Sequence, residues 1–413
     1  MNKKDSFSWA HIKPALNFTV LVASLGYFVD MYDLVLYGIV RIPSLKALGL
    51  SGEALISTGM FLLNMQMLGM LIGGIIWGIL GDKKGRLSVL FGSIALYSLA
   101  NIANAFVTTI PAYAIARFVA GVGLAGELGA AITLVIEILK KESRGYGTTI
   151  VASMGILGSV TAGLVGEYFP WKWAYIFGGM LGLVLLVLRA KMLESGMFSA
   201  ILADPNVKRG NFISLFTNQK RFLKYLRCIL IGLPTWFVVG ILIMLSPEIA
   251  VSLGVQGDVA AGKSIMYCYA GLVVGDLASG FASQVYKSRK RIVLVFLLMT
   301  AAMIITYLTS NGLSLHQFYT LCFVMGIAIG YWAVFVTIAS EQFGTNLRAT
   351  VTTTVPNFVR GGVVLITLSF QFLKPTYGLI GAAYIVGFLT LSIALLSLFF
   401  MEETYHKDLD YLE

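Results

Sequence analysis

The most constraining feature of the sequence is a series of apolar stretches, each long enough to cross a membrane. A helix needs about 20 apolar residues to cross the hydrocarbon core of a bilayer. Hydrophobic residues make up 58% of the 413-residue chain and charged residues only 12%, a composition outside the range of a soluble domain. We therefore expect an all-α membrane protein with spans at residues 17–40, 55–80, 87–107, 110–136, 147–168, 172–188, 226–249, 264–286, 291–309, 315–339, 349–372 and 377–401.

The basic residues predict how these twelve spans are oriented. An even number of spans places both termini on the same side of the membrane. If that side is the cytoplasm, most of the 30 Lys and Arg residues lie in cytoplasmic segments, and the outer segments hold only Arg41, Lys46, Lys172, Lys263 and Lys374. This asymmetry follows the positive-inside rule and explains the net charge of +10 without a nucleic-acid partner. We expect a multi-pass protein of the cell inner membrane with both termini in the cytoplasm.

The two halves of the chain repeat the same charged pattern. Glu137 is followed seven residues later by Arg144, and Glu341 is followed by Arg348 at the same spacing. Carriers built from repeats bind their substrate where the repeats meet. We therefore expect two six-helix bundles and a cytoplasmic central loop, at residues 1–188, 225–413 and 189–224 respectively.

Two motifs in the first half resemble signatures of a known superfamily. Residues 78–86 read GILGDKKGR, which is similar to the signature between helices 2 and 3 of the major facilitator superfamily. Residues 117–127 read RFVAGVGLAGE, which is similar to the second signature of that superfamily, in helix 4. The resemblance covers essentially the whole chain. It implies a transporter rather than an enzyme, with twelve transmembrane helices in two six-helix bundles related by pseudo-two-fold symmetry.

Further segments resemble particular branches of the superfamily. Residues 27–38 look like the first helix of the sugar-porter, phosphate-symporter and metabolite-symporter branches, as do Glu194-Ser195 and the terminal segment 402–404. The proline-arginine continuation after Glu194-Ser195 and the proline and lysine of the sugar-porter terminal motif are missing, which argues against a sugar substrate. The resemblance implies proton-coupled symport, with the proton as coupling ion and no other cofactor.

Four ionisable residues in the first and fourth spans are candidates for proton coupling. An ionised side chain at mid-bilayer costs several kcal/mol, so such a residue is a functional candidate. Asp33 and Arg117 each lie about 10 Å below the outer boundary of their spans, at a depth where they can pair. The resemblance implies that Asp33 accepts the proton and that Arg117 adjusts the proton affinity of Asp33. The alternative is that the two residues form a static ion pair. Asp30 is a second titratable group or a substrate contact, and Glu127 is a second coupling site or a structural acid.

Candidate substrate contacts lie in the second half. A guanidinium binds carboxylate or phosphate through two parallel hydrogen bonds, so Arg360 is the candidate for an anionic substrate group; the alternative is an internal pair with Asp276. Asn357 precedes Arg360 by three positions and shares its face. Binding pockets combine apolar walls with few polar groups. The candidate wall residues, for which simple packing is the alternative, are Trp236, Tyr331 and Trp332.

Charged residues at the cytoplasmic ends of the spans resemble the inter-bundle network of related carriers. The resemblance implies that their ion pairs close the cytoplasmic side while the outside is open. The candidate gate residues are Asp82, Arg86, Glu137, Arg144, Glu194, Glu341 and Arg348. The three cysteines and three histidines show no metal-ligand spacing, so we expect no metal site.

These patterns predict a secondary active transporter that works by alternating access, as a monomer in the lipid bilayer. The predicted activity is proton symport of a small anionic or zwitterionic metabolite. An organic acid, including a polycarboxylate or siderophore, is favoured over an amino acid. One alternative is a proton-driven exporter or antiporter of a similar solute. The other is a non-transporting membrane sensor built on the carrier fold.

Overall fold

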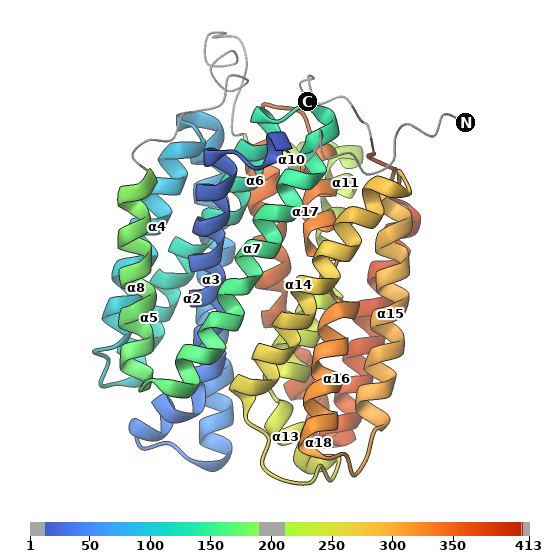
Figure 1. Ribbon diagram of the computed structural model, residues 1–413. Coiled ribbons are helices and arrows are strands. Elements are labelled where there is room, and N and C mark those ends of the chain that lie inside the picture. Colours follow the sequence, from blue (N-terminus) through green and yellow to red (C-terminus); the bar gives the residue numbers. More distant parts are fainter. Residues whose placement is uncertain (1–12, 190–210, 406, 408–413) are drawn as a thin grey trace.

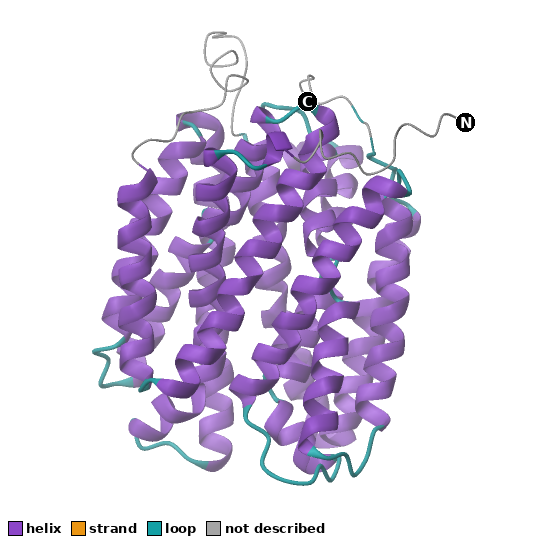
Figure 2. Ribbon diagram, viewed as in Figure 1, coloured by secondary structure: helices purple, strands orange, loops and turns teal. Residues whose placement is uncertain are grey.

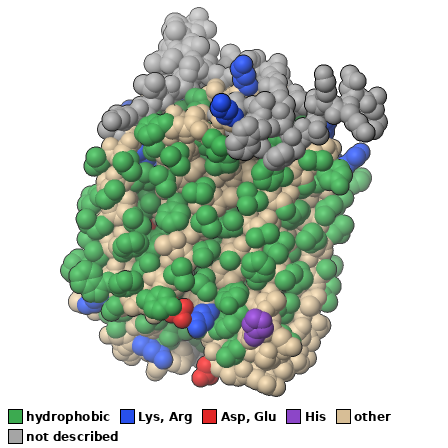
Figure 3. All heavy atoms as spheres, viewed as in Figure 1, with side chains coloured by type: hydrophobic (Ala, Val, Ile, Leu, Met, Phe, Trp, Pro, Cys, Tyr) green, Lys and Arg blue, Asp and Glu red, His purple; other side chains and the backbone are tan. Residues whose placement is uncertain are grey.

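The computed structural model describes residues 13–189, 211–405 and 407, and these residues are almost entirely helical (Figures 1 and 2). In lipid, backbone polar groups must be satisfied internally, which a helix does within one segment. Hydrophobic side chains cover the sides of the molecule between its two ends, and charged side chains gather toward the ends (Figure 3). The molecule is therefore a multi-pass membrane protein.

The first half contains six spans. Its fourth span is interrupted between Leu124 and Glu127, where the segment Ile110–Ile138 divides into two helices. The described helices of this half are α2 (Phe18–Ala47), α3 (Gly52–Lys84), α4 (Arg86–Asn104), α5 (Ile110–Leu124), α6 (Glu127–Ile138), α7 (Lys141–Tyr168) and α8 (Trp171–Leu188), preceded by the short η1 (Lys13–Ala15).

The second half also contains six spans, and its seventh and tenth spans are broken. The seventh passes through a π-helix, η3 (Val238–Ile243), a form that is often found at functional sites. The remaining helices of this half are α10 (Ser214–Thr217), α11 (Gln219–Leu230), α12 (Leu233–Phe237), α13 (Ser246–Ser252), α14 (Ala261–Val285), α15 (Arg289–Thr309), α16 (Leu315–Ala328), α17 (Trp332–Glu341) and α18 (Arg348–Phe399).

The prediction of twelve spans is confirmed once α18 is divided. Eleven described helices are long and apolar enough to cross a membrane, and the longest of them, the 52-residue α18, contains two spans. These spans meet at Gly378, whose φ of 69° is left-handed and favours glycine. The start of α2 and the end of α18 consequently lie at the same end of the molecule (Figure 1). We call this end the terminal face and the opposite end the far face.

Glycines allow matching helices of the two halves to pack closely. A Cβ atom added at Gly121 of α5 would overlap the backbone of Gln66 on α3. In the second half, a Cβ atom at Gly326 of α16 would overlap the backbone of Cys268 on α14. Small residues at such crossings let helix backbones approach closely in lipid. The second span packs on the fourth in the first half, and the eighth packs on the tenth in the second half. This matching packing agrees with the repeat that the charged motifs predict.

The boundaries of the two bundles differ from the predicted ones at two points. Arg189, expected in the central loop, is fully buried. The helix α11 begins at Gln219, six residues before the expected start of the second bundle. Both differences arise because basic residues beside an apolar stretch look like loop residues in the sequence. The halves meet mainly where α3 packs against α18 and where α7 packs against α14.

Candidate transport site

Arg360 is buried beside two indole rings, whose centroids lie 6.4 Å apart. Its guanidinium carbon is 5.8 Å from the ring centroid of Trp236 and 5.7 Å from that of Trp332. Its Nη1 donates to Asn357 Oδ1 at 3.2 Å, and its Nη2 lies 3.9 Å from the sulfur of Met31 in the other half. The expected shared face of Asn357 and Arg360 is thus confirmed. A cation beside two aromatic rings at the boundary of the halves can bind an anion that also carries an apolar or aromatic part.

Several buried polar atoms around Arg360 have no hydrogen-bond partner among the described residues. They are both carboxylate oxygens of Asp30, Oη of Tyr27, Nε1 of Trp332, Oδ2 of Asp276 and Nε of Arg360. Buried polar groups in proteins are nearly always hydrogen-bonded, so such a concentration needs an explanation. Donors and acceptors that converge on one place without partners are what a polar ligand requires.

Asp276 and Tyr331 stand beside this centre and stabilise the broken tenth span. Asp276 Oδ1 accepts a hydrogen bond of 2.7 Å from the backbone N–H of Ala333, at the start of α17. A carboxylate at a helix N-terminus satisfies free N–H groups and the helix dipole. Tyr331 donates its hydroxyl to the carbonyl of Ile231 at 2.9 Å. Asp276 forms no ion pair with Arg360, so the alternative of an internal pair between them is wrong.

Asp33 and Arg117 lie inside the first half and do not form the predicted ion pair. Both are fully buried, and none of their side-chain nitrogen and oxygen atoms has a hydrogen-bond partner among the described residues. Asp33 points toward α8, where a Cβ atom at Gly178 would overlap its carboxylate. Arg117 lies over the rings of Tyr37 and Tyr175, at 5.1 and 5.8 Å from their centroids. Equal depth in the membrane did not predict which way each side chain points.

Glu127 is paired with Arg189, a partner that the sequence reasoning missed. Arg189 donates to both carboxylate oxygens of Glu127 and, at 2.7 Å, to the carbonyl of Leu90 on α4. Gly26 on α2 faces this pair, and a Cβ atom there would overlap both side chains. Asp30 is within electrostatic range of Glu127, Arg189 and Arg360. Asp30 therefore lies between the buried pair of the first half and the cation of the second half.

At the terminal face, Asp82 closes the space between the halves by capping a helix of the opposite half. Its carboxylate accepts hydrogen bonds from the backbone N–H groups of Ala349 and Thr350, at 3.2 and 2.8 Å, and from the hydroxyl of Thr350 at 2.6 Å. These residues form the first turn of α18. The aspartate of the predicted signature thus serves as an anionic helix cap across the boundary of the halves.

Ion pairs around this cap repeat between the halves. Arg86 donates to Glu137 at 2.6 Å, and Arg289 donates to Glu341 at 3.2 Å, so each half joins the loop after its second span to the end of its fourth. Across the halves, Arg348 Nη1 lies 3.8 Å from Glu137. Arg144 donates to the carbonyls of Ile136 and Leu139 in its own half. Glu194 lies outside the described residues.

Ion pairs also link the two halves at the far face, beside a cavity of about 780 Å³ that Met60, Glu248 and Phe370 help to line. Arg41, expected in an outer segment, is fully buried near the end of α2 and pairs with Glu248 of the other half at 3.2 Å. Lys263 and Glu167 form a second pair across the halves, at 3.1 Å on the surface. Between the two faces, a small apolar cavity of about 30 Å³ lies against Trp236, Val35 and Tyr269. Contacts between the halves are therefore present at both faces.

Two six-helix halves that meet around a buried polar centre define a membrane carrier. The family model of the Major Facilitator Superfamily matches residues 23–366. The chain therefore belongs to the major facilitator superfamily and is a transporter rather than an enzyme.

Comparison with known proteins gives relatives that match over most of both chains. The chain is 27% identical to the putative niacin/nicotinamide transporter NiaP of Bacillus subtilis, over 83% of this chain and 85% of the relative. It is also 27% identical to the 3-(3-hydroxy-phenyl)propionate transporter of Escherichia coli, over 70% and 71% of the two chains. Among solved structures, the proton:xylose symporter XylE has a TM-score of 0.74 at 16% identity, over 95% of this chain and 97% of that chain. This last similarity shows the shared fold alone.

Proposed function

We propose that the protein is a proton symporter that carries a small aromatic carboxylate across the cell inner membrane into the cytoplasm. In this proposal the terminal face is cytoplasmic, as the distribution of basic residues predicts, and the protein works as a monomer. The observation that supports it most is the placement of Arg360 beside both Trp236 and Trp332, at the boundary of the halves.

The chemistry of this centre favours an acid attached to a ring. A carboxylate can accept two hydrogen bonds from the guanidinium of Arg360, and an aromatic ring can pack against the two indoles. The unpartnered hydroxyl of Tyr27 and the indole N–H of Trp332 can bind further polar groups of the substrate. Relatives named for niacin and for 3-(3-hydroxy-phenyl)propionate support this class. Binding pockets of this kind combine apolar walls with a few placed polar groups.

Asp33 and Arg117 are the proposed proton-coupling residues, with Asp30 and Glu127 as further acids along the first half. Negative charge inside a bilayer is costly, and protonation removes it. A guanidinium that approaches or leaves a carboxylate changes how strongly the carboxylate holds its proton. Because Arg117 is near Asp33 without bonding it, a small movement of α5 against α2 can change their interaction. Rocking of the halves would then link proton binding to the side of the membrane on which the substrate site is open.

The test is transport by purified protein in liposomes, with labelled nicotinate and 3-(3-hydroxyphenyl)propionate as substrates. Exchange of substrate at equal pH on both sides measures binding and rocking, and accumulation driven by a pH gradient measures coupling. We expect Asp33→Asn to retain exchange and lose accumulation, because the amide cannot carry a proton. We expect Arg360→Gln to lose both, because the substrate anion loses its partner.

Different results would contradict different parts of the proposal. Accumulation by Asp33→Asn at the rate of the unmodified protein would rule out Asp33 as the coupling residue. Exchange of sugars or amino acids, but not of the two acids, would rule out the substrate class. Depletion of substrate under an inward proton gradient would indicate an exporter. A complete lack of exchange across acids, amino acids, phosphate and sugars would favour the sensor.

A further inference from the structure

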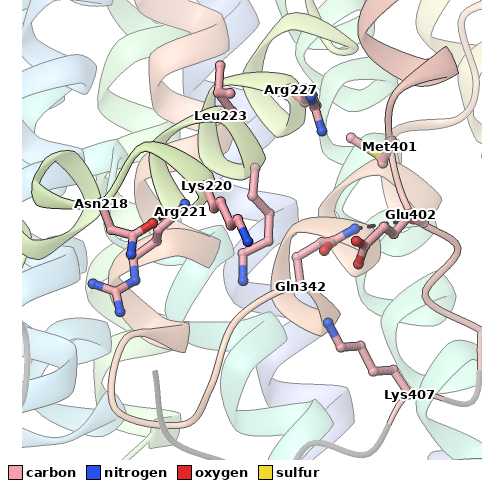
Figure 4. A pocket seen from close by; sticks show the side chains of 10 residues that line it. Asn218, Lys220, Arg221, Leu223, Arg227, Gln342, Met401, Glu402 and Lys407 are labelled. Atoms are coloured by element: carbon pink, nitrogen blue, oxygen red, sulfur yellow. Dashed lines mark hydrogen bonds between the residues drawn. The ribbon is translucent and has the colours of Figure 1, made fainter.

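A second cavity lies at the terminal face, away from the transport site. It has a volume of about 440 Å³ and lies between α11, the end of α17 and the segment after α18. Lys220 extends into it from α11, and Lys407 extends toward it from the opposite side (Figure 4). Its volume falls within the range of small-ligand pockets, about 300–1,000 Å³. The cavity belongs to the second half alone, so it can persist while the halves move against each other.

The side chains that line this cavity carry a large excess of positive charge. Five are basic and one, Glu402, is acidic; the basic ones are Lys220, Arg221, Lys224, Arg227 and Lys407. The positive-inside rule explains basic residues at such a position but not their convergence on one cavity. Like charges four residues apart on a helix are unfavourable, yet Lys220 and Lys224 have this spacing. A bound anion would remove that repulsion.

Two of the basic residues anchor the walls. Arg227 donates to the carbonyl of Phe400 at 2.8 Å, and Arg221 donates to the carbonyl of Ser214 at 2.9 Å. These hydrogen bonds hold the last turn of α11 against the end of α18 and the first turn of α11 against α10. The cavity also holds three lysines, one of which, Lys224, lies 4.3 Å from the ring centroid of Phe343. Ammonium groups on flexible stems suit the binding of phosphate.

Exposed apolar side chains lie beside the cavity. Ile213 and Phe216 precede α11, and Phe399 and Phe400 end α18; all four are about half exposed or more. Apolar side chains next to a cluster of basic residues are typical of the zone where a protein meets lipid headgroups. Basic pockets between membrane helices on the cytoplasmic side bind phosphate-bearing headgroups. This surrounding surface favours a ligand that the membrane itself supplies.

We propose that this cavity is a binding site for a phosphate-bearing anion, separate from the substrate site. An anionic phospholipid headgroup and a soluble phosphate compound share this chemistry. The ligand phosphate would lie among Lys220, Lys224 and Lys407 and would join α11 to the segment after α18.

The test is a binding titration of the purified full-length protein with short-chain phosphatidylglycerol, short-chain phosphatidylcholine and inorganic pyrophosphate. Each basic residue near a membrane surface changes the affinity for anionic lipid about fivefold. We therefore expect Lys220→Gln/Lys224→Gln to bind phosphatidylglycerol about thirtyfold more weakly than the unmodified protein. The charge-retaining Lys220→Arg/Lys224→Arg should bind within a few-fold of the unmodified protein.

The matched control is Lys83→Gln/Lys84→Gln, which removes the same charge from exposed positions at the terminal end of α3. It should bind phosphatidylglycerol as the unmodified protein does. Pyrophosphate is the preferred ligand if it binds more tightly than phosphatidylglycerol and if Lys220→Gln/Lys224→Gln loses this binding. That result would support the site with a soluble ligand. Equal losses in the variant and the control, or equal affinity for phosphatidylcholine, would overturn the proposal. Thermal unfolding of each variant shows whether it is folded.

Discussion

At the scale of single residues, Glu127 and Arg189 show how the first half tolerates charge in its interior. Both side chains are fully buried, and Arg189 also donates to the carbonyl of Leu90. Good geometry and additional hydrogen bonds of this kind offset the cost of burying two charges. The absence of a side chain at Gly26 makes room for them. The pair thereby holds the end of α8 against α2, α4 and α6.

Arg189→Gln should destabilise the protein strongly. Removing one partner of a buried pair leaves the other charge uncompensated, at a cost of about 3–5 kcal/mol. Reversible unfolding in mixed micelles measures the change in the free energy of unfolding. The double variant Glu127→Gln/Arg189→Gln should lose less than Arg189→Gln, since no lone charge remains. If Arg189→Gln were as stable as the unmodified protein, the pair would contribute nothing to the free energy of unfolding.

At the scale of helices, carboxylates that cap helix N-termini recur at the terminal face. Glu403 accepts hydrogen bonds from the backbone N–H groups of Arg289, at 2.9 Å, and Lys290, at 3.2 Å, and from the Ser288 hydroxyl. These groups form the start of α15. Partial burial acts to raise the pKa of Glu403, but the hydrogen bonds from Ser288 and from backbone N–H groups outweigh it and lower the pKa below its ordinary value of 4.5. The segment after α18 is therefore docked by an ionised side chain.

Docking of this segment should depend on pH. Because the pKa of Glu403 is lower in the folded protein, its contribution is fully present above pH 4.5 and is lost as the pH falls through the lower folded value. A fluorescent label at Lys407→Cys should gain mobility over this acidic range, measured as a fall in anisotropy. Glu403→Gln should show high mobility already at neutral pH and little further change. Equal pH profiles with and without the substitution would exclude Glu403 as the group responsible.

At the scale of the whole molecule, the closure of the terminal face depends on contacts between the halves. Asp82 of the first half caps α18 of the second, and Thr353 of α18 packs against Gly129 of α6. On the far face, Arg41 and Glu248 provide the corresponding link. Alternating access requires that these two sets of contacts break in turn.

Asp82→Ala should open the terminal face. Loss of a helix cap costs about 1 kcal/mol, which corresponds to a several-fold rise in the open population. The measurement is the alkylation rate of Thr353→Cys by a membrane-impermeant maleimide, with the three native cysteines replaced. Lys83→Ala, one position further on and exposed, is the control and should leave the rate unchanged. An unchanged rate in Asp82→Ala would show that other contacts keep this face closed.

Much of the architecture is predictable because hydrophobicity, charge asymmetry and the repeat act over many residues. The twelve spans and the repeated motifs at Glu137 and Glu341 are predictable for this reason. The ion pairs Arg86–Glu137 and Arg289–Glu341 occupy matching positions in the two repeats. Contacts that depend on the direction of one side chain were not predictable. Depth placed Asp33 and Arg117 at one level but did not show that they face different neighbours. Arg189 and Arg41 were misassigned because a basic residue beside an apolar stretch looks the same whether it points out or in.

The cap that Asp82 supplies to α18 also limits how firmly the carrier is held in one state. Each hydrogen bond contributes about 0.5–1.5 kcal/mol net, so the three bonds of this carboxylate amount to only a few kcal/mol. An energy gap of that size leaves a minor conformer at about 0.1–10% of the population. A bound ligand shifts such an equilibrium by its difference in affinity for the two conformers. A substrate reverses which conformer predominates when its affinities for the two differ by about tenfold at the upper end of this range and by about a thousandfold at the lower end.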